Sequence, residues 1–254
     1  MHVRSLILGA ITSAFILPIA ALAESTKTVV LVHGAFADGS AWNKVIPLLQ
    51  EEGLKTIAVQ LPMTSLADDV AFTQRAIDNA EGEVVLVGHS WGGVVITEAG
   101  ADEDVTSLVY VSAFAPKAGE HIHDILDDAH KVRGVPTVDG FAAPIVDEHK
   151  FIRLSDETVV TYFAPDIPEA DARLIAAGQG RLHAAALDQA PSEQAWDAKP
   201  SWYIVAANDQ MIAPAVQREQ AERIGATTVE IPASHVGMLS KPEDVAGVII
   251  DAAK

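Results

Sequence analysis

Short apolar runs rich in β-branched residues alternate along this chain with longer amphipathic segments, which limits the possible folds more than any other feature. Apolar strands without a polar face are typical of a sheet buried on both faces. Strands that alternate with helices favour a parallel sheet with right-handed crossovers. We therefore predict an α/β fold with a mostly parallel, twisted sheet and helices on both faces. The predicted strands are Thr28–Val32, Lys55–Val59, Val84–Val87, Ser107–Val111, Trp202–Ala206 and Thr227–Ile231.

The amphipathic segments carry residues that are typical of helix ends. Pro214 stands near the start of one segment and Gly225 just past its end, the usual asymmetry of helix termini. Ser240 and Glu243 have the spacing of a capping box. Apolar residues recur with helical spacing from Trp42 to Leu49. The other predicted helices are Leu66–Ala80, Trp91–Ala99, Pro214–Ile224 and Glu243–Ala252.

Residues 115–199, called the cap below, interrupt this alternation. The segment is rich in Pro, Asp, Ala and His, and it contains helical patterns at Ser155–Phe163 and Ala170–Ala177. A structureless connection of this length is uncommon inside a compact domain. We therefore predict an inserted helical cap over one end of the sheet.

The N-terminal segment, residues 1–23, has the parts of a secretory signal peptide. Arg4 precedes an apolar run at 6–19, and Ala21-Leu22-Ala23 forms a cleavage signature. We expect cleavage after Ala23, leaving one domain at 24–254 in the periplasm or outside the cell. A membrane anchor is the alternative, which the short run and Pro18 disfavour. No later run is long enough to span a bilayer, so we expect no stable membrane insertion after cleavage.

Net charge and cysteine content exclude several classes of function. The formal charge of −18 repels nucleic acid and anionic lipid, so we expect neither as a partner. The chain has no cysteine, which excludes a thiol nucleophile and a thiolate metal site. His121, His123 and His130 stand near several aspartates but lack metal-site spacing, so we predict a solvated loop and no metal.

Residues 88–92 form a G-x-S-x-G motif between a predicted strand and a predicted helix. In that context the serine stands on a sharp turn with its hydroxyl exposed above the sheet. Ser90 is therefore the candidate nucleophile, and a purely structural turn is the alternative. The Trp91 N–H would lie at a helix N-terminus, where it can stabilise a developing oxyanion.

A serine nucleophile needs a histidine base and a carboxylate that orients the base. Where the serine of a G-x-S-x-G motif lies between a strand and a helix, the acid and then the histidine follow it along the chain. Active sites of open α/β sheets lie past the carboxyl ends of the strands. His235 and Asp209 each follow a predicted strand, so we predict them as the base and the acid. A surface histidine and a helix-capping aspartate are the alternatives. Asp188 and Asp197, in the cap, are weaker candidates for the acid.

The loop after the first strand should supply a second oxyanion donor. Ala35 is the first choice for that backbone N–H and Phe36 the second. His33 and His89 are interpreted as scaffold, with His33 tying the loop down by a hydrogen bond. The residues predicted to line the substrate pocket are Phe36, Phe114 and Met238.

Four stretches together resemble the α/β-hydrolase superfamily: residues 33–42, 88–93, 206–214 and 233–245. They are most similar to its small esterase/hydroxynitrile-lyase-like branch, which includes plant methyl-ester hydrolases and bacterial pyrethroid-hydrolase-like esterases. The resemblance covers essentially the whole mature chain. It implies an α/β-hydrolase fold and the same triad and oxyanion residues. The plant lyases carry a threonine after the motif histidine, where this chain has Gly34, which argues against cyanohydrin cleavage.

The sequence thus predicts a cofactor-free serine carboxylesterase that cleaves a small, largely apolar ester through an acyl-enzyme. The alternatives on the same fold are a lyase, a C–C hydrolase, a perhydrolase and a non-catalytic ligand-binding protein. A homodimer is an alternative to a monomer.

Overall fold

The computed structural model describes residues 27–254, so the predicted signal peptide and its cleavage site lie outside the described residues. One six-stranded sheet has the order β2-β1-β3-β4-β8-β9, and every neighbouring pair is parallel. The predicted parallel α/β sheet is therefore confirmed. Its strands are β1 (Lys27–Val32), β2 (Lys55–Ala58), β3 (Glu83–His89), β4 (Val105–Val111), β8 (Ser201–Ala206) and β9 (Thr227–Ile231).

The strand order places the loops after β1 and β3 next to each other. From β1 in the interior of the sheet the chain continues to the edge strand β2, and it then returns to pair β3 with the other side of β1. Ligands of open α/β sheets bind in the crevice outside the strand carboxyl ends at such a reversal. The reversal lies where residues 33–36 and Ser90 follow their strands.

Burial separates the central strands from the edges. Residues 29–32 and 84–87 are fully buried, as the apolar runs predict. In β9, by contrast, residues 227–230 are exposed and only Ile231 is buried, because this strand forms an edge of the sheet. Its β-branched residues indicated a strand correctly but not one covered on both faces.

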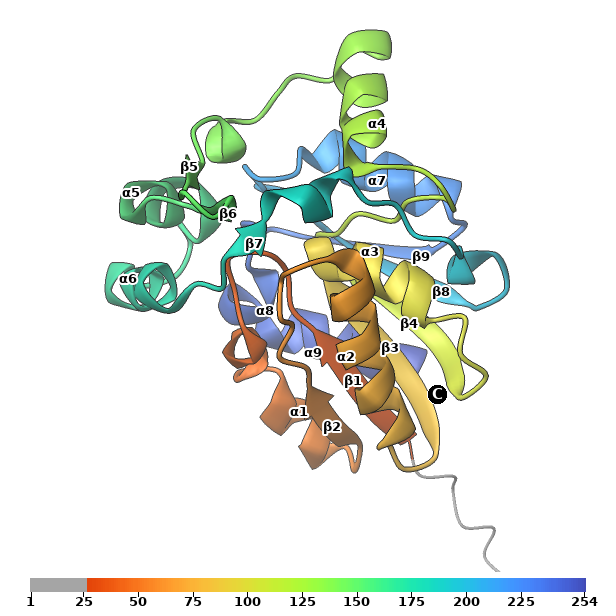
Figure 1. The fold of residues 1–254 in the computed structure, drawn as a ribbon. Helices are drawn as coiled ribbons and strands as arrows, with labels where there is room; N and C mark the ends of the chain where they lie inside the picture. Colours follow the sequence, from red (N-terminus) through yellow and green to blue (C-terminus); the bar gives the residue numbers. More distant parts are fainter. Residues whose placement is uncertain (1–26) are drawn as a thin grey trace, which may run out of the picture.

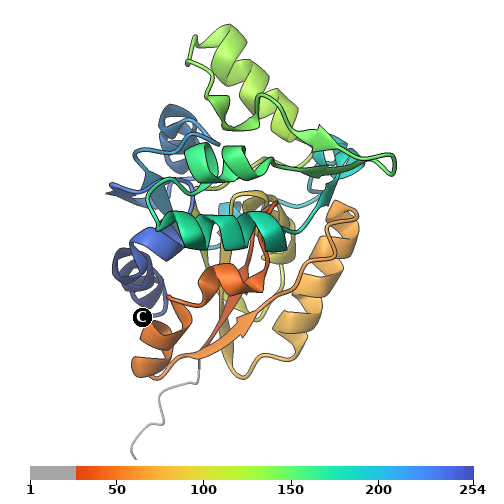
Figure 2. The ribbon, with the colours of Figure 1, turned by 90° about the vertical axis from the view of Figure 1, so that its left-hand side faces the viewer.

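Helices cover both faces of the sheet. On one face α2 (Leu66–Asp78) packs against α3 (Trp91–Ala99), and on the other α1 (Ile46–Glu51) packs against α9 (Pro242–Ala252). Figure 2 shows these two layers with the strands between them. The remaining helices outside the cap are α7 (Pro214–Arg223), α8 (Gly237–Ser240) and the 3₁₀ turn η1 (Gly39–Trp42). No helix in the described part of the chain is long and apolar enough to cross a membrane.

Two predicted helix starts differ from the structure. The predicted segment from Trp42 is divided into η1 and α1, and Pro47 stands in the first turn of α1. The capping box at Ser240 does not form: Ser240 ends α8, and α9 begins after Lys241 without a side-chain cap. Pro242 begins α9 instead, since proline has no N–H to leave unpaired there.

The cap lies over the carboxyl ends of the strands, as Figure 1 shows. The predicted helical patterns correspond to α5 (Asp156–Thr158) with η4 (Val159–Phe163), and to α6 (Glu169–Gly178). A three-stranded antiparallel sheet was not predicted, because strands of two or three residues carry no readable periodicity. The other cap elements are α4 (Ile122–Asp127), η2 (Asp128–Val132), η3 (Asp139–Phe141), β5 (Ile145–Val146), β6 (Phe151–Arg153), β7 (Leu182–His183), η5 (Ala184–Asp188) and η6 (Ala195–Asp197).

Candidate active site

Ser90 occupies a strained turn between β3 and α3. Its φ of 53° and ψ of −118° lie in a region that residues other than glycine rarely adopt. Three main-chain hydrogen bonds hold the turn: Ser90 N donates to the Val111 carbonyl, and the Ser90 carbonyl accepts from Gly93 and Phe114. The side chain is nearly buried, with 8% of the residue exposed. Strain that the surrounding structure maintains in this way is typical of functional sites.

Two glycines make this turn possible because their neighbours leave no room for a side chain. A Cβ on Gly88 would lie 2.5 Å from the Gly92 carbonyl oxygen, where β3 passes α3. A Cβ on Gly34, in the loop after β1, would lie 2.6 Å from the Ser90 Cβ. Gly34 therefore allows the loop after β1 to approach the turn that carries Ser90.

Replacing Gly34 by alanine is expected to lower both stability and activity. The added methyl must displace the Ser90 turn, and overpacking of this kind costs about 1–3 kcal/mol. Urea unfolding and kcat measure the two effects. Gly247→Ala in α9 is the control, because a Cβ there meets nothing within 4 Å and kcat should not change. If Gly34→Ala kept the wild-type kcat, the close approach of the loop after β1 to the Ser90 turn would not be needed for activity.

Asp209 and His235 meet at the same edge of the sheet. His235 Nδ1 donates to Asp209 Oδ2 at 2.7 Å, and both residues are almost fully buried. The Asp209 loop follows β8, and the His235 loop follows β9. Because a carboxylate only accepts, this bond places the ring proton on Nδ1 and leaves Nε2 free to take a proton.

Asp209 is held by three further N–H donors. Its Oδ1 accepts from Met211 N at 2.7 Å and Ile212 N at 3.1 Å, and its Oδ2 also accepts from Gln217 Nε2 at 2.7 Å. Donors on both oxygens fix the orientation of the carboxylate toward His235. Sequence reasoning missed Gln217, for which the only available signal was a polar residue on the buried face of α7.

The alternative acids lie elsewhere. Asp188 and Asp197 are exposed in the cap, where Asp188 lies 3.4 Å from His123 and Asp197 accepts a hydrogen bond from Gln194. The structure therefore brings Asp209, and neither of these two, to His235.

His89 joins the Ser90 turn to the His235 loop. His89 Nε2 donates to the His235 carbonyl at 2.9 Å, and the two rings lie 4.6 Å apart between centroids. Burial lowers the pKa of His89 well below its usual value, so its ring is neutral. The Ser90 hydroxyl forms no hydrogen bond with residues 27–254. In free enzymes such bonds often form only when substrate binds.

His33 ties down the loop after β1, as predicted. Its Nδ1 donates to the Gly34 carbonyl at 2.9 Å, and its Nε2 accepts from Leu61 N at 3.0 Å. Burial lowers the pKa of His33, which keeps the ring neutral and able to serve in both roles.

Among the main-chain N–H groups around Ser90, those of Ala35, Phe36 and Trp91 have no hydrogen-bond partner within residues 27–254. Unpaired buried N–H groups are rare in proteins. Phe36 has a φ of 63°, and Ala35 and Phe36 are both buried. These amides are therefore available to a developing oxyanion, with Trp91 at the N-terminus of α3. Ala35 and Phe36 are both still candidates for the second donor.

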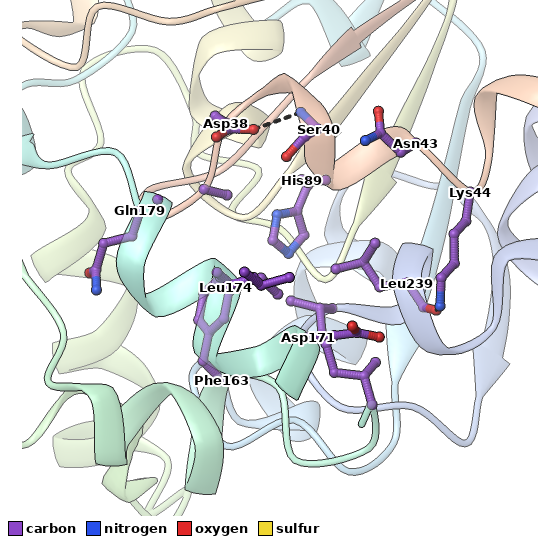
Figure 3. Close-up of a pocket in the computed structure, with 16 residues that line it drawn as sticks. Asp38, Ser40, Asn43, Lys44, His89, Phe163, Asp171, Leu174, Gln179 and Leu239 are labelled. Atoms are coloured by element: carbon purple, nitrogen blue, oxygen red, sulfur yellow. Dashed lines mark hydrogen bonds between the residues drawn. The ribbon is translucent and has the colours of Figure 1, made fainter. Parts of the chain in front are cut away.

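A cavity of about 350 Å³ is lined by His89, the residue before Ser90, and by Val236, the residue after His235; Ser90, Asp209 and His235 are not among its lining residues. Figure 3 shows Phe163 and Leu174 of the cap on one side, with Ser40 and Lys44 on the other and His89 between them. Phe163 also packs edge-on against the His235 ring, with centroids 5.3 Å apart. The other lining residues are Ala37, Asp38, Ala41, Asn43, Ile167, Asp171, Ile175, Gly178, Gln179, Val236 and Leu239.

The three residues predicted to line the pocket do not line this cavity. Met238 is fully buried in the core, and the Phe36 ring packs against Phe141 of the cap at 5.8 Å. Phe114 is half-buried and packs against the core. Nearness to the motifs in sequence suggested these residues, whereas α6 and η4 of the cap supply much of the apolar wall.

The cap is also bonded to the His235 loop. Ser234 N donates to Asp166 Oδ2 at 2.7 Å, and the Ser234 hydroxyl donates to Asp166 Oδ1. Asp166 lies between η4 and α6. The cap therefore touches the loop that carries the candidate base as well as the cavity.

Comparisons with known proteins agree with this architecture. A model of the alpha/beta hydrolase family matches residues 29–248. A pyrethroid hydrolase of Sphingobium wenxiniae is 28% identical over 255 residues, covering 89% of this chain and 87% of its own. Polyneuridine aldehyde esterase of Rauvolfia serpentina is 25% identical over 264 residues, covering 91% and 97%. A crystal structure of polyneuridine aldehyde esterase superposes with a TM-score of 0.76 at 22% identity, covering 90% of this chain and 100% of that one.

Proposed function

This chain belongs to the alpha/beta hydrolase family, and from that premise we propose that it hydrolyses small, largely apolar carboxylic esters through a triad of Ser90, His235 and Asp209. One observation carries the proposal. The buried Asp209–His235 hydrogen bond of 2.7 Å lies at the sheet edge where the strained turn presents Ser90. The esterase and hydrolase names of the relatives support the same reaction class.

In the proposed acylation step, Ser90 Oγ attacks the ester carbonyl while His235 Nε2 takes the hydroxyl proton. Asp209 keeps the ring in the correct tautomer and stabilises the imidazolium that forms. The Trp91 N–H and that of Ala35 or Phe36 donate to the oxyanion. When the carbon–oxygen bond breaks, His235 gives its proton to the leaving alcohol, and the acyl group stays on Ser90.

Deacylation repeats the sequence with water. His235 takes a proton from water as the water oxygen attacks the acyl carbonyl, and the same amides hold the second oxyanion. Collapse of this intermediate releases the carboxylic acid and returns the proton to Ser90. The proposed scheme uses only these side chains, main-chain amides and water, and no step in it requires a cofactor.

The cavity favours a small apolar group on the substrate. Its volume of about 350 Å³ lies at the lower end of the range for small-molecule sites. Phe163, Ile175 and Leu239 contribute apolar surface, whereas Asp38 and Lys44 stand among the polar lining residues. An acyl or alcohol part of modest size would bury its apolar surface here.

A lyase on the same fold is less well supported. A threonine after the motif histidine would need space at Gly34, where a Cβ would lie 2.6 Å from the Ser90 Cβ. A non-catalytic binding protein would have no need for the strained Ser90 turn, which costs folding free energy.

Two experiments test the proposal. A fluorophosphonate should label the wild-type protein, and mass mapping should place the adduct on Ser90; labelling that survives in Ser90→Ala contradicts the assignment. A panel of esters with varied acyl and alcohol length should show turnover, fastest for small apolar groups. Cyanohydrin or peracid turnover without ester hydrolysis would favour the lyase or the perhydrolase. Tight ester binding without turnover would favour the binding protein.

A further inference from the structure

Asp69 is a fully buried carboxylate that the proposed mechanism does not use. It lies on α2, and both of its oxygens accept hydrogen bonds. The Trp91 indole Nε1 donates to Oδ2 at 2.7 Å, and Met63 N donates to Oδ1 at 2.8 Å. Trp91 is the residue directly after Ser90, so the carboxylate binds the side chain of the residue whose main-chain N–H is a candidate oxyanion donor.

The position of Asp69 is costly for the fold. Burial raises its pKa to about 6, although the hydrogen bonds from Trp91 and Met63 act in the opposite direction. No Lys, Arg or His forms an ion pair with Asp69 within residues 27–254. The charged group that acts on it is Asp68 on the same helix, which raises the pKa further, and the packed elements contribute Trp91 and Met63, which do not titrate. A buried, unpaired carboxylate of this kind adds little to stability and is often functional.

The two donors connect the Ser90 turn to the cap. Met63 has a φ of 61°, a strained value for a residue with a side chain. Its N–H is bound by Asp69, and its carbonyl accepts from His183 N of β7 at 2.9 Å. Asp69 therefore lies between the first turn of α3 and a loop that holds one strand of the cap.

We propose that Asp69 is a positioning residue for the oxyanion site: by holding the Trp91 indole it fixes the first turn of α3 and the direction of the Trp91 N–H. The inference rests on the proposed ester hydrolysis, in which that N–H stabilises the oxyanion. Removal of one oxyanion donor lowers kcat by about 10²–10³-fold. Misdirecting the donor should therefore reduce kcat by a smaller factor, while KM changes little.

Asparagine cannot replace this carboxylate. Two N–H donors face the two oxygens, and an amide has only one acceptor, so one donor would meet an NH₂ group. Asp69→Asn is therefore expected to lower kcat by about 10- to 100-fold, within the range of a misplaced catalytic group. Asp78→Asn makes the same charge change at the exposed last residue of α2 and should leave kcat unchanged.

A spectroscopic test separates positioning from general damage. The Trp91 indole N–H resonance can be assigned by its loss in Trp91→Phe. Its chemical shift should change with pH, and the midpoint of that change should lie near the Asp69 pKa of about 6. Below this pH the Asp69 carboxyl group is protonated and accepts a weaker hydrogen bond from the Trp91 indole N–H. The shift should persist in Ser90→Ala, which keeps the contact, and vanish in Asp69→Asn.

The outcomes are distinct from those of the proposed function. An indole resonance that does not shift with pH, or an Asp69→Asn kcat equal to that of Asp78→Asn, overturns this inference. A wild-type protein that turns over no ester overturns the proposed function, and that result is known before any Asp69 variant is made. A parallel loss of kcat and folded structure in Asp69→Asn, seen in its thermal unfolding, would assign Asp69 a structural role and also overturns the inference.

Discussion

Replacing Ser90 by alanine is expected to lower kcat by about 10⁴- to 10⁶-fold on the best ester of the panel. His235 would keep its bond to Asp209 but have no hydroxyl to activate, and the chain has no cysteine that could take over as nucleophile. Residual turnover would come from the oxyanion amides and substrate binding alone. Initial rates at saturating substrate measure the effect. Retention of more than about 1% of wild-type kcat is inconsistent with a nucleophilic role, given losses of this size in other triads.

Two substitutions at Ser90 distinguish the loss of catalysis from the relief of backbone strain. Ser90→Ala keeps a Cβ at a φ of 53°, so it should unfold at nearly the wild-type urea concentration. Ser90→Gly removes the Cβ, and relief of such strain is worth on the order of 1 kcal/mol. Ser90→Gly should therefore be inactive and more stable than Ser90→Ala. A glycine variant of lower stability would mean that the turn is not strained.

The second large effect is expected for Asp209→Asn, which should lower kcat by about 10⁴-fold. The carboxylate accepts from His235, Gln217 and two main-chain amides, and an asparagine amide cannot accept all four. Its NH₂ group, placed toward His235 Nδ1, would move the ring proton to Nε2, which must be free to act as the base. Steady-state kinetics across pH 6–9 measure the loss.

Matched controls for this variant are present in the cap. Asp188→Asn and Asp197→Asn make the same change at the two weaker candidates for the acid, and both residues are exposed. We expect wild-type kcat for each, because neither is bonded to His235. A large loss of kcat in either control, together with little loss in Asp209→Asn, would show that Asp188 or Asp197, and not Asp209, is the acid of the triad.

Local patterns in the sequence predicted the six strands of the large sheet and the helices α2, α3, α7 and α9 to within about two residues. The predicted strand Thr227–Ile231 and the predicted helix Trp91–Ala99 have the same bounds in the structure. These bounds were readable because the β-branched residues of 227–231 favour a strand and because the G-x-S-x-G motif predicts a helix directly after its serine. The patterns were weakest in the cap, where most of the elements were not predicted, and they did not indicate that residues 227–230 of β9 are exposed.

The positions of the candidate residues were also readable from the chain. Ser90, Asp209 and His235 each follow a strand, and parallel strands bring their carboxyl ends to one edge. The Asp209–His235 contact joins residues that are 26 positions apart, and the His89–His235 bond joins residues 146 apart. The catalytic roles themselves are still predictions, which the variants above test.

By itself, the sequence determined the α/β class, the sharp turn at Ser90 and the residues that could form a triad, because each depends on short-range spacing and backbone sterics. Only the tertiary structure decided the order of the strands, the small sheet in the cap and the residues that line the cavity. It also revealed Gln217 behind Asp209 and Asp69 behind Trp91. In a sequence, a polar residue that will be buried and hydrogen-bonded looks the same as one that will be exposed, because its partner is distant along the chain. The G-x-S-x-G motif was thus enough to predict the Ser90 turn. The side chains that hold Asp209 and Trp91 in place could be identified only from the structure.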